Sequence, residues 1–276
     1  LETIREYRDK IGPARGVQVS TRDFRDKYDI ADSIQFIDFV SRELQEGLSP
    51  GRALEYLLKG NARFVSGRQM KRDFERQVNS TAVGQHPVAA ILHCIDSRSP
   101  AELLFDLGLG DIFSIRVAGN IATNEVLGSM EYATAVAGAK LVVVLGHTRC
   151  GAVGAAVQAA CYPDRPVAPE CTHLPSIVES IGRVVDEDCC SLPVGAPASR
   201  LQAVVDEVAR RNVVQVVREI RRESEVIEKL VSEGRLGIVG MLYDVSSGEV
   251  TVVPDTAAGL PEAMVKKAAR EGVAAW

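Results

Sequence analysis

The sequence predicts an α/β protein with a central, mostly parallel sheet flanked by helices. Two short apolar runs, 88–92 and 141–145, lack polar alternation, which is typical of strands buried on both faces of a parallel sheet. Stretches of helical length separate the strand patterns, and this spacing favours right-handed βαβ units. With 276 residues, of which 46% are hydrophobic, the chain has room for one sizeable α/β domain with appendages or for two small ones.

We divide the chain into a helical N-terminal extension (1–50), a main domain (51–256) and a C-terminal tail (257–276) that we expect to be helical. The extension is rich in charge, and its apolar residues recur at helical spacing between Ile34 and Val40. This pattern predicts one or two amphipathic helices.

The first half of the main domain contains several helix and strand signals. Ser49 and Pro50 predict an N-cap and first helical position for a helix that runs to Phe64. After the polar stretch 66–86, a strand is expected from Pro87. The run Ser99-Pro100-Ala101-Glu102 predicts a second capped helix start, with a capping box. A strand over 111–117 and a helix over 124–137 follow.

The second half begins with a strand over 140–146 and a helix of small residues over 152–160. Residues 161–200 contain six prolines and predict a surface excursion with one short helix over 177–185. A long amphipathic helix is expected over 201–222, and 236–253 is typical of a terminal β-hairpin.

Two motifs follow the two buried strands: Cys94-Ile95-Asp96-Ser97-Arg98 and Gly146-His147-Thr148-Arg149-Cys150-Gly151. Because the carboxyl ends of neighbouring parallel strands form the ligand-binding crevice of an open α/β sheet, the two motifs can share one site. Two thiolates and an imidazole, from Cys94, Cys150 and His147, suit Zn²⁺ and leave a fourth position open, as in catalytic zinc sites. The pair His147 and Cys150 alone would be a weak signal, since buried cysteines are usually small apolar residues.

The combined motifs resemble the β-class carbonic anhydrases. The runs 60–65, 131–133 and 236–244 are also similar to segments of that family. The resemblance implies reversible hydration of CO₂ to bicarbonate by a zinc-bound hydroxide, with one Zn²⁺ per chain held by Cys94, His147 and Cys150.

The resemblance also assigns catalytic roles to Asp96 and Arg98. Asp96 would accept a hydrogen bond from the hydroxide, and Arg98 would hold the Asp96 carboxylate away from the metal. The alternative is an ordinary surface ion pair that contributes under about 1 kcal/mol.

Gln85, Phe113 and Tyr132 match the positions that bind substrate in the constitutively open subclass of the family. The regulated subclass has a Trp just before the first cysteine, whereas the single Trp here is Trp276. Tyr132 could otherwise be a plain core residue of its helix. An exposed histidine would serve as the proton shuttle, with His86, His93 and His173 as the candidates.

The resemblance further implies a homodimer or higher homo-oligomer, in which the N-terminal extension clasps a second subunit or covers its own sheet. The net charge of −5 gives no reason to expect nucleic acid or an anionic membrane as partner. No apolar run reaches the length of a membrane span and no leader opens the chain, so a cytoplasmic location is expected. The chain starts at Leu1, and any upstream segment is outside this sequence.

Cys161, Cys171, Cys189 and Cys190 are expected to be incidental or redox-sensitive surface thiols.

The sequence leaves two alternatives for the function open. The same scaffold could hydrolyse CS₂ or carbonyl sulfide, or the chain could be a non-catalytic zinc-binding module of a larger protein such as a transporter.

Overall fold

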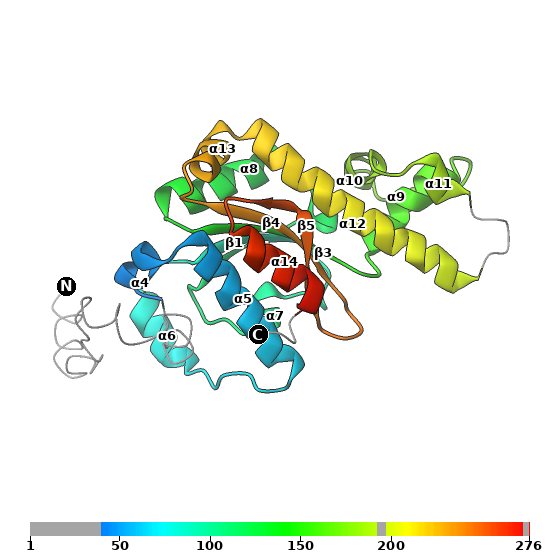
Figure 1. The fold of residues 1–276 in the computed structure, drawn as a ribbon. Coiled ribbons are helices and arrows are strands. Elements are labelled where there is room, and N and C mark those ends of the chain that lie inside the picture. The colour runs from blue at the N-terminus through cyan, green and yellow to red at the C-terminus, as the bar shows by residue number, and fades with distance from the viewer. Residues whose placement is uncertain (1–39, 192–196, 273–275) are drawn as a thin grey trace. The chain divides into compact units, whose positions relative to one another are not determined.

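The computed structural model describes residues 40–191, 197–272 and 276 (Figure 1). The chain divides into two compact units, 1–37 and 38–276, and the described residues belong to the second. Residues 1–39, which hold all but the last residue of the helical pattern between Ile34 and Val40, lie outside the described part.

A five-stranded sheet with the order β2-β1-β3-β4-β5 forms the centre of this unit. The strands are β1 (Ala89–His93), β2 (Ile112–Arg116), β3 (Leu141–His147), β4 (Gly237–Tyr243) and β5 (Val250–Ala258). All neighbours pair in parallel except β4 and β5, which are antiparallel. The mostly parallel sheet and the C-terminal hairpin are therefore confirmed. Every residue of β1 and of β3 is buried, as their unbroken apolar runs predict.

The long helix α12 (Ala198–Glu223) covers one face of the sheet (Figure 1). Its valines at 213, 216 and 217 form a core with Val142 and Val144 of β3. Gly146 permits this close packing, because a Cβ there would lie 2.5 Å from Cγ2 of Val213. The helix therefore lies directly against the strand that carries His147.

The remaining helices surround this core. Helix α5 (Pro50–Val65) starts at the predicted Ser49 cap, and its Gly51 lies against Pro261 at the start of α14 (Glu262–Glu271). The expected helix over 124–137 is α8 (Asn124–Glu131) followed by a π-helical segment, η2 (Tyr132–Val136). The others are α4 (Arg42–Gly47), α6 (Phe74–Thr81), α7 (Ala101–Leu104), α9 (Gly151–Cys161), α10 (Leu174–Gly182), α11 (Glu187–Cys190) and α13 (Glu225–Ser232).

One local prediction was wrong, and two helices were not predicted. Ser99 does not cap α7, because the N-cap is Pro100 and the Ser99 hydroxyl donates to the Asp96 carbonyl oxygen at 3.0 Å. Helix α6, which lies within the polar stretch 66–86, and helix α13 were not predicted. Both helices have a side-chain cap, Asp73 for α6 and Ser224 for α13.

The surface-thiol prediction was wrong for three of its four cysteines. Cys161, at the end of α9, forms a disulfide with Cys190 of α11. Cys189 is a free thiol but is buried, and only Cys171 is a free exposed thiol.

Among the described helices, none is both long and apolar enough to cross a membrane.

Candidate metal centre

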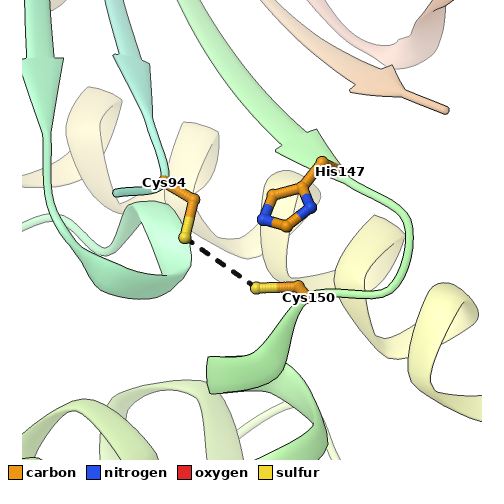
Figure 2. Close-up of side chains that lie close together, drawn as sticks. All are labelled: Cys94, His147 and Cys150. Carbon is orange, nitrogen blue, oxygen red and sulfur yellow. Dashed lines mark hydrogen bonds between the residues drawn. The ribbon is translucent and has the colours of Figure 1, made fainter. Parts of the chain in front are cut away.

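Cys94, His147 and Cys150 converge at the carboxyl ends of two adjacent strands (Figure 2). Cys94 directly follows β1, His147 is the last residue of β3, and Cys150 is the N-cap of α9. The two sulfur atoms lie 4.0 Å apart, and one ligand atom from each residue lies within 4.8 Å of the others. Because these atoms lie so close together, the predicted meeting of the two motifs is confirmed. All three side chains are buried.

The imidazole of His147 is oriented to offer one nitrogen to this cluster. Its Nδ1 lies 2.9 Å from the carbonyl oxygen of Thr148, to which it donates. Its Nε2 is buried and has no hydrogen-bond partner among the described residues. A buried nitrogen lone pair without a donor is costly unless a metal occupies it, so the arrangement of His147 fits a metal ligand.

The two sulfurs suit a soft divalent cation. The hydrogen bond from Cys150 lowers the pKa of the Cys94 thiol to about 4, against the opposing effect of burial. The same hydrogen bond, together with burial, raises the pKa of Cys150. Both sulfurs bind a metal as thiolates, so a metal bound here would displace the protons of the pair. Two sulfurs and one imidazole nitrogen are a ligand set typical of Zn²⁺.

Asp96 and Arg98 form a bidentate pair beside the ligands. Arg98 Nε lies 2.9 Å from Asp96 Oδ1, and Arg98 Nη2 lies 2.8 Å from Asp96 Oδ2. These hydrogen bonds hold the pKa of Asp96 at about 2. Asp96 Oδ2 is 4.0 Å from His147 Nε2, so the carboxylate faces the ligand cluster while its charge is paired with Arg98.

Arg116 at the end of β2 also holds the first motif, a role not predicted from the sequence. Its Nε donates to the carbonyl oxygen of Cys94 at 3.2 Å, and its Nη2 donates to that of Asp96 at 2.8 Å. The strand register pairs Arg116 with His93, next to Cys94. A polar residue at the end of a strand adjacent to β1 was the available signal.

Phe113 and Tyr132 lie together, but within one chain they are away from the ligands. Their ring centroids are 6.1 Å apart in an edge-to-face arrangement, and both line a groove of about 600 Å³. Phe113 pairs with Ala90, four positions before Cys94, which corresponds to roughly 13 Å along a strand. Tyr132 is 53% exposed, so it is not a core residue of the isolated chain.

Gln85 is exposed and precedes β1, whereas Cys94 follows it. A single chain therefore places Gln85 at the opposite end of this strand from the metal ligands.

Of the candidate proton shuttles, His93 does not fit the role of an exposed group. It is buried, and its Nε2 lies 2.8 Å from the Ser114 hydroxyl. Burial, assisted by the charge of Arg116, lowers the pKa of His93 to about 4. His86 is half-buried and His173 is exposed, so neither is excluded by burial.

Comparisons with known proteins agree with this geometry. The model of the carbonic anhydrase family matches residues 89–250. Carbonic anhydrase 2 of Mycobacterium tuberculosis is 36% identical over 205 residues, which cover 74% of this chain and 93% of that protein. The carbonic anhydrase of Mycolicibacterium smegmatis is 36% identical over 204 residues, which cover 73% and 92%. The crystal structure of the β-carbonic anhydrase CafA of Aspergillus fumigatus matches with a TM-score of 0.56 and 26% identity, over 70% of this chain and 86% of that one.

Proposed function

Since the chain belongs to the carbonic anhydrase family, in its β-class, and is thereby a lyase (carbonate dehydratase), we propose that it reversibly hydrates CO₂ to bicarbonate with one Zn²⁺ per chain. The observation that carries this proposal is the buried cluster of Cys94, His147 and Cys150, with Nε2 of His147 free to bind a metal. The ligands would be the two sulfurs and that nitrogen.

When bound there, Zn²⁺ would supply Lewis acidity that makes water a nucleophile near neutral pH. Asp96 stays ionised at neutral pH because its pKa is about 2. Its carboxylate can therefore accept a hydrogen bond from the attacking water and orient a lone pair toward CO₂. Arg98 binds both oxygens of Asp96 and so restrains the carboxylate from binding the metal itself.

The Asp96–Arg98 pair also supports the constitutively open subclass. A carboxylate released from Arg98 could take the fourth metal position and close the site, and the pair described here opposes that movement. The Trp that the regulated subclass places just before the first cysteine has no counterpart, because the single Trp of this sequence is Trp276.

We also propose that the chain acts as a homodimer or higher homo-oligomer. In the described part, β2 pairs only with β1, so its other edge is available to a second copy. Tyr132 and Val136 are 53% and 70% exposed and would be covered by such a contact. Gln85, Phe113 and Tyr132 would then line the substrate pocket from across the subunit boundary, since they lie away from the ligands of their own chain.

Three expectations stay predictions: the domain division at residues 50 and 256, an N-terminal extension that clasps a second subunit, and the cytoplasmic location.

The proposal is tested by metal analysis and a stopped-flow CO₂ assay on the same sample. We expect close to one zinc per chain and rapid CO₂ hydration that is lost when a chelator removes the metal. Rates with carbonyl sulfide, measured in parallel, should be far lower. Zinc-replete protein with negligible CO₂ hydration would refute the proposed reaction, and a monomer by light scattering would refute the shared pocket.

A further inference from the structure

Two polar side chains of α12 reach the backbone of the segments that carry the metal ligands. Asn212 is buried, and its Nδ2 donates to the carbonyl oxygen of Gly119 at 2.9 Å. Asp206 accepts from the backbone N–H of Arg149, with Oδ1 2.7 Å from the nitrogen. Cys94 and Cys150 belong to the same buried cluster as Val205, Val208 and Ala209 of this helix. Figure 2 shows turns of α12, in pale yellow, beside the three ligands.

The Asn212 contact acts on Cys94 through Gly119. The backbone N–H of Gly119 points at Cys94 Sγ, with the nitrogen 3.4 Å from the sulfur. Gly119 has a φ of 67°, which is favourable for glycine alone, and a Cβ there would lie 2.4 Å from Cδ1 of Ile181. Glycine is the least restrained residue of a backbone. The Asn212 bond to the Gly119 carbonyl restrains the peptide that follows this glycine, next to the peptide whose N–H faces the sulfur.

The Asp206 contact acts on the turn between the other two ligands. Arg149, between His147 and Cys150, has a φ of 56°, a left-handed conformation that costs a non-glycine residue roughly 1 kcal/mol. The Asp206 carboxylate stabilises that turn by binding the Arg149 N–H. The carbonyl oxygen of Arg149 in turn accepts from Arg98 Nη2 at 3.3 Å, and Arg98 holds Asp96. Asp206 is thus linked through one residue to the Asp96–Arg98 pair.

We propose that Asn212 and Asp206 are positioning residues through which α12 sets the geometry of the metal centre. This inference rests on the proposed zinc site. Neither side chain binds the metal; each restrains a backbone segment that contacts or joins the ligand residues. Groups that orient metal ligands typically change metal affinity or activity by 10- to 100-fold when they are removed.

The positioning role of Asn212 is tested with Asn212→Ala and Asn212→Asp. Aspartate has the same shape but does not donate when ionised, and it places a negative charge against the Gly119 carbonyl. We expect both variants to bind zinc roughly tenfold or more weakly in competition with a chelator. The sulfur-to-metal charge-transfer band of the cobalt-substituted protein should also shift. Gln215→Ala is the matched control, because this amide lies on the same helix and donates to Glu219 rather than to a ligand segment.

The positioning role of Asp206 is tested with Asp206→Ala and Asp206→Asn. Alanine removes the acceptor for the Arg149 N–H, whereas the asparagine amide oxygen can still accept it. We expect Asp206→Ala to weaken zinc binding and to lower kcat about tenfold, with KM little changed. Asp206→Asn should recover most of both. This pair decides the proposal if the Asn212 variants do not fold.

Folded Asn212 and Asp206 variants with the zinc affinity and cobalt spectrum of Gln215→Ala would overturn the inference. An equal loss in Asp206→Ala and Asp206→Asn would also overturn it, because a retained acceptor should rescue. Failure of the proposed function is distinguishable, since the unmodified protein would then lack zinc or would not hydrate CO₂.

Discussion

Two pairs of cysteines in this molecule lie close enough to interact, and they have different fates. Cys94 and Cys150 stay reduced with their sulfurs 4.0 Å apart, whereas Cys161 and Cys190 are joined by a disulfide. The first pair has a third neighbour, the free Nε2 of His147, and it lies buried at the end of the sheet. The second pair joins a helix end to a peripheral helix, α11. A buried imidazole nitrogen beside the two sulfurs, and not the presence of two nearby cysteines, therefore distinguishes the candidate metal centre from the disulfide.

Replacing one cysteine of each pair by alanine should produce the largest difference between the metal-binding pair and the disulfide pair. Cys150→Ala removes one of the three candidate ligands and should release the metal and abolish CO₂ hydration, a loss well beyond a hundredfold. Cys190→Ala should leave metal content and rate within about twofold of the unmodified protein, because Cys190 is not part of the ligand cluster. Metal analysis and stopped-flow rates measure both. A zinc-replete Cys150→Ala protein would contradict the ligand assignment.

Asp96→Asn should sharpen the difference between holding the metal and using it. The amide keeps the size of the side chain but loses the charge that Arg98 pairs with and the strong acceptor that orients water. We expect near-normal zinc content and a fall in kcat of roughly a hundredfold. An unchanged kcat would mean that Asp96 has a structural role only.

Loss of the disulfide should affect stability rather than chemistry. The bond closes a segment with a sequence separation of 29, and constraining a loop of that size in the unfolded chain contributes about 3.6 kcal/mol. Cys190→Ser should therefore lower the free energy of unfolding by up to that amount, as measured by urea denaturation without reductant. Adding a dithiol reductant to the unmodified protein should produce the same decrease, and an effect only in the variant would argue against the bond.

The smallest expected effect is on stability in acid. Asp96, near the Cys94–Cys150 pair, and Asp186, at the N-cap of the helix that carries Cys190, each have a carboxyl pKa of about 2. Asp96 is bound by Arg98, and Asp186 accepts from the backbone of Cys189 and from Arg211. Because both folded pKa values lie below the ordinary 3.8, each group stabilises the fold above pH 4 and loses that contribution as the pH falls toward 2. Asp96→Asn and Asp186→Asn should each flatten the fall in unfolding free energy over this range. An unaltered slope in both would contradict the assigned partners.

The sheet was predictable because its strands carry strong local patterns. The apolar runs of β1 and β3 allow few alternatives to a buried strand, and Ser49-Pro50 marks the start of α5. The Ser99 prediction failed because a serine before a proline can also turn its hydroxyl back to the preceding segment, here to the Asp96 carbonyl. Helix α13 did have a signal, a serine followed by apolar residues at helical spacing.

The ligand cluster could be predicted because its residue types are chemically distinctive. The residues that orient it could not, because Arg116, Asn212 and Asp206 act on backbone atoms, and such contacts depend on where a distant helix or strand lies. The Cys161–Cys190 bond was missed for a similar reason. No spacing rule links those two cysteines, and only the packing of α10 and α11 against α9 brings them together.

The disulfide also makes part of the chain a covalent ring. The turn between α9 and α10 is largely exposed, so it is where a protease would cut the ring most readily. A single cut there would leave both fragments covalently attached, one carrying all three ligand residues and the other carrying α12. Under non-reducing electrophoresis the nicked protein would therefore migrate as one species, and the pieces would separate only after reduction.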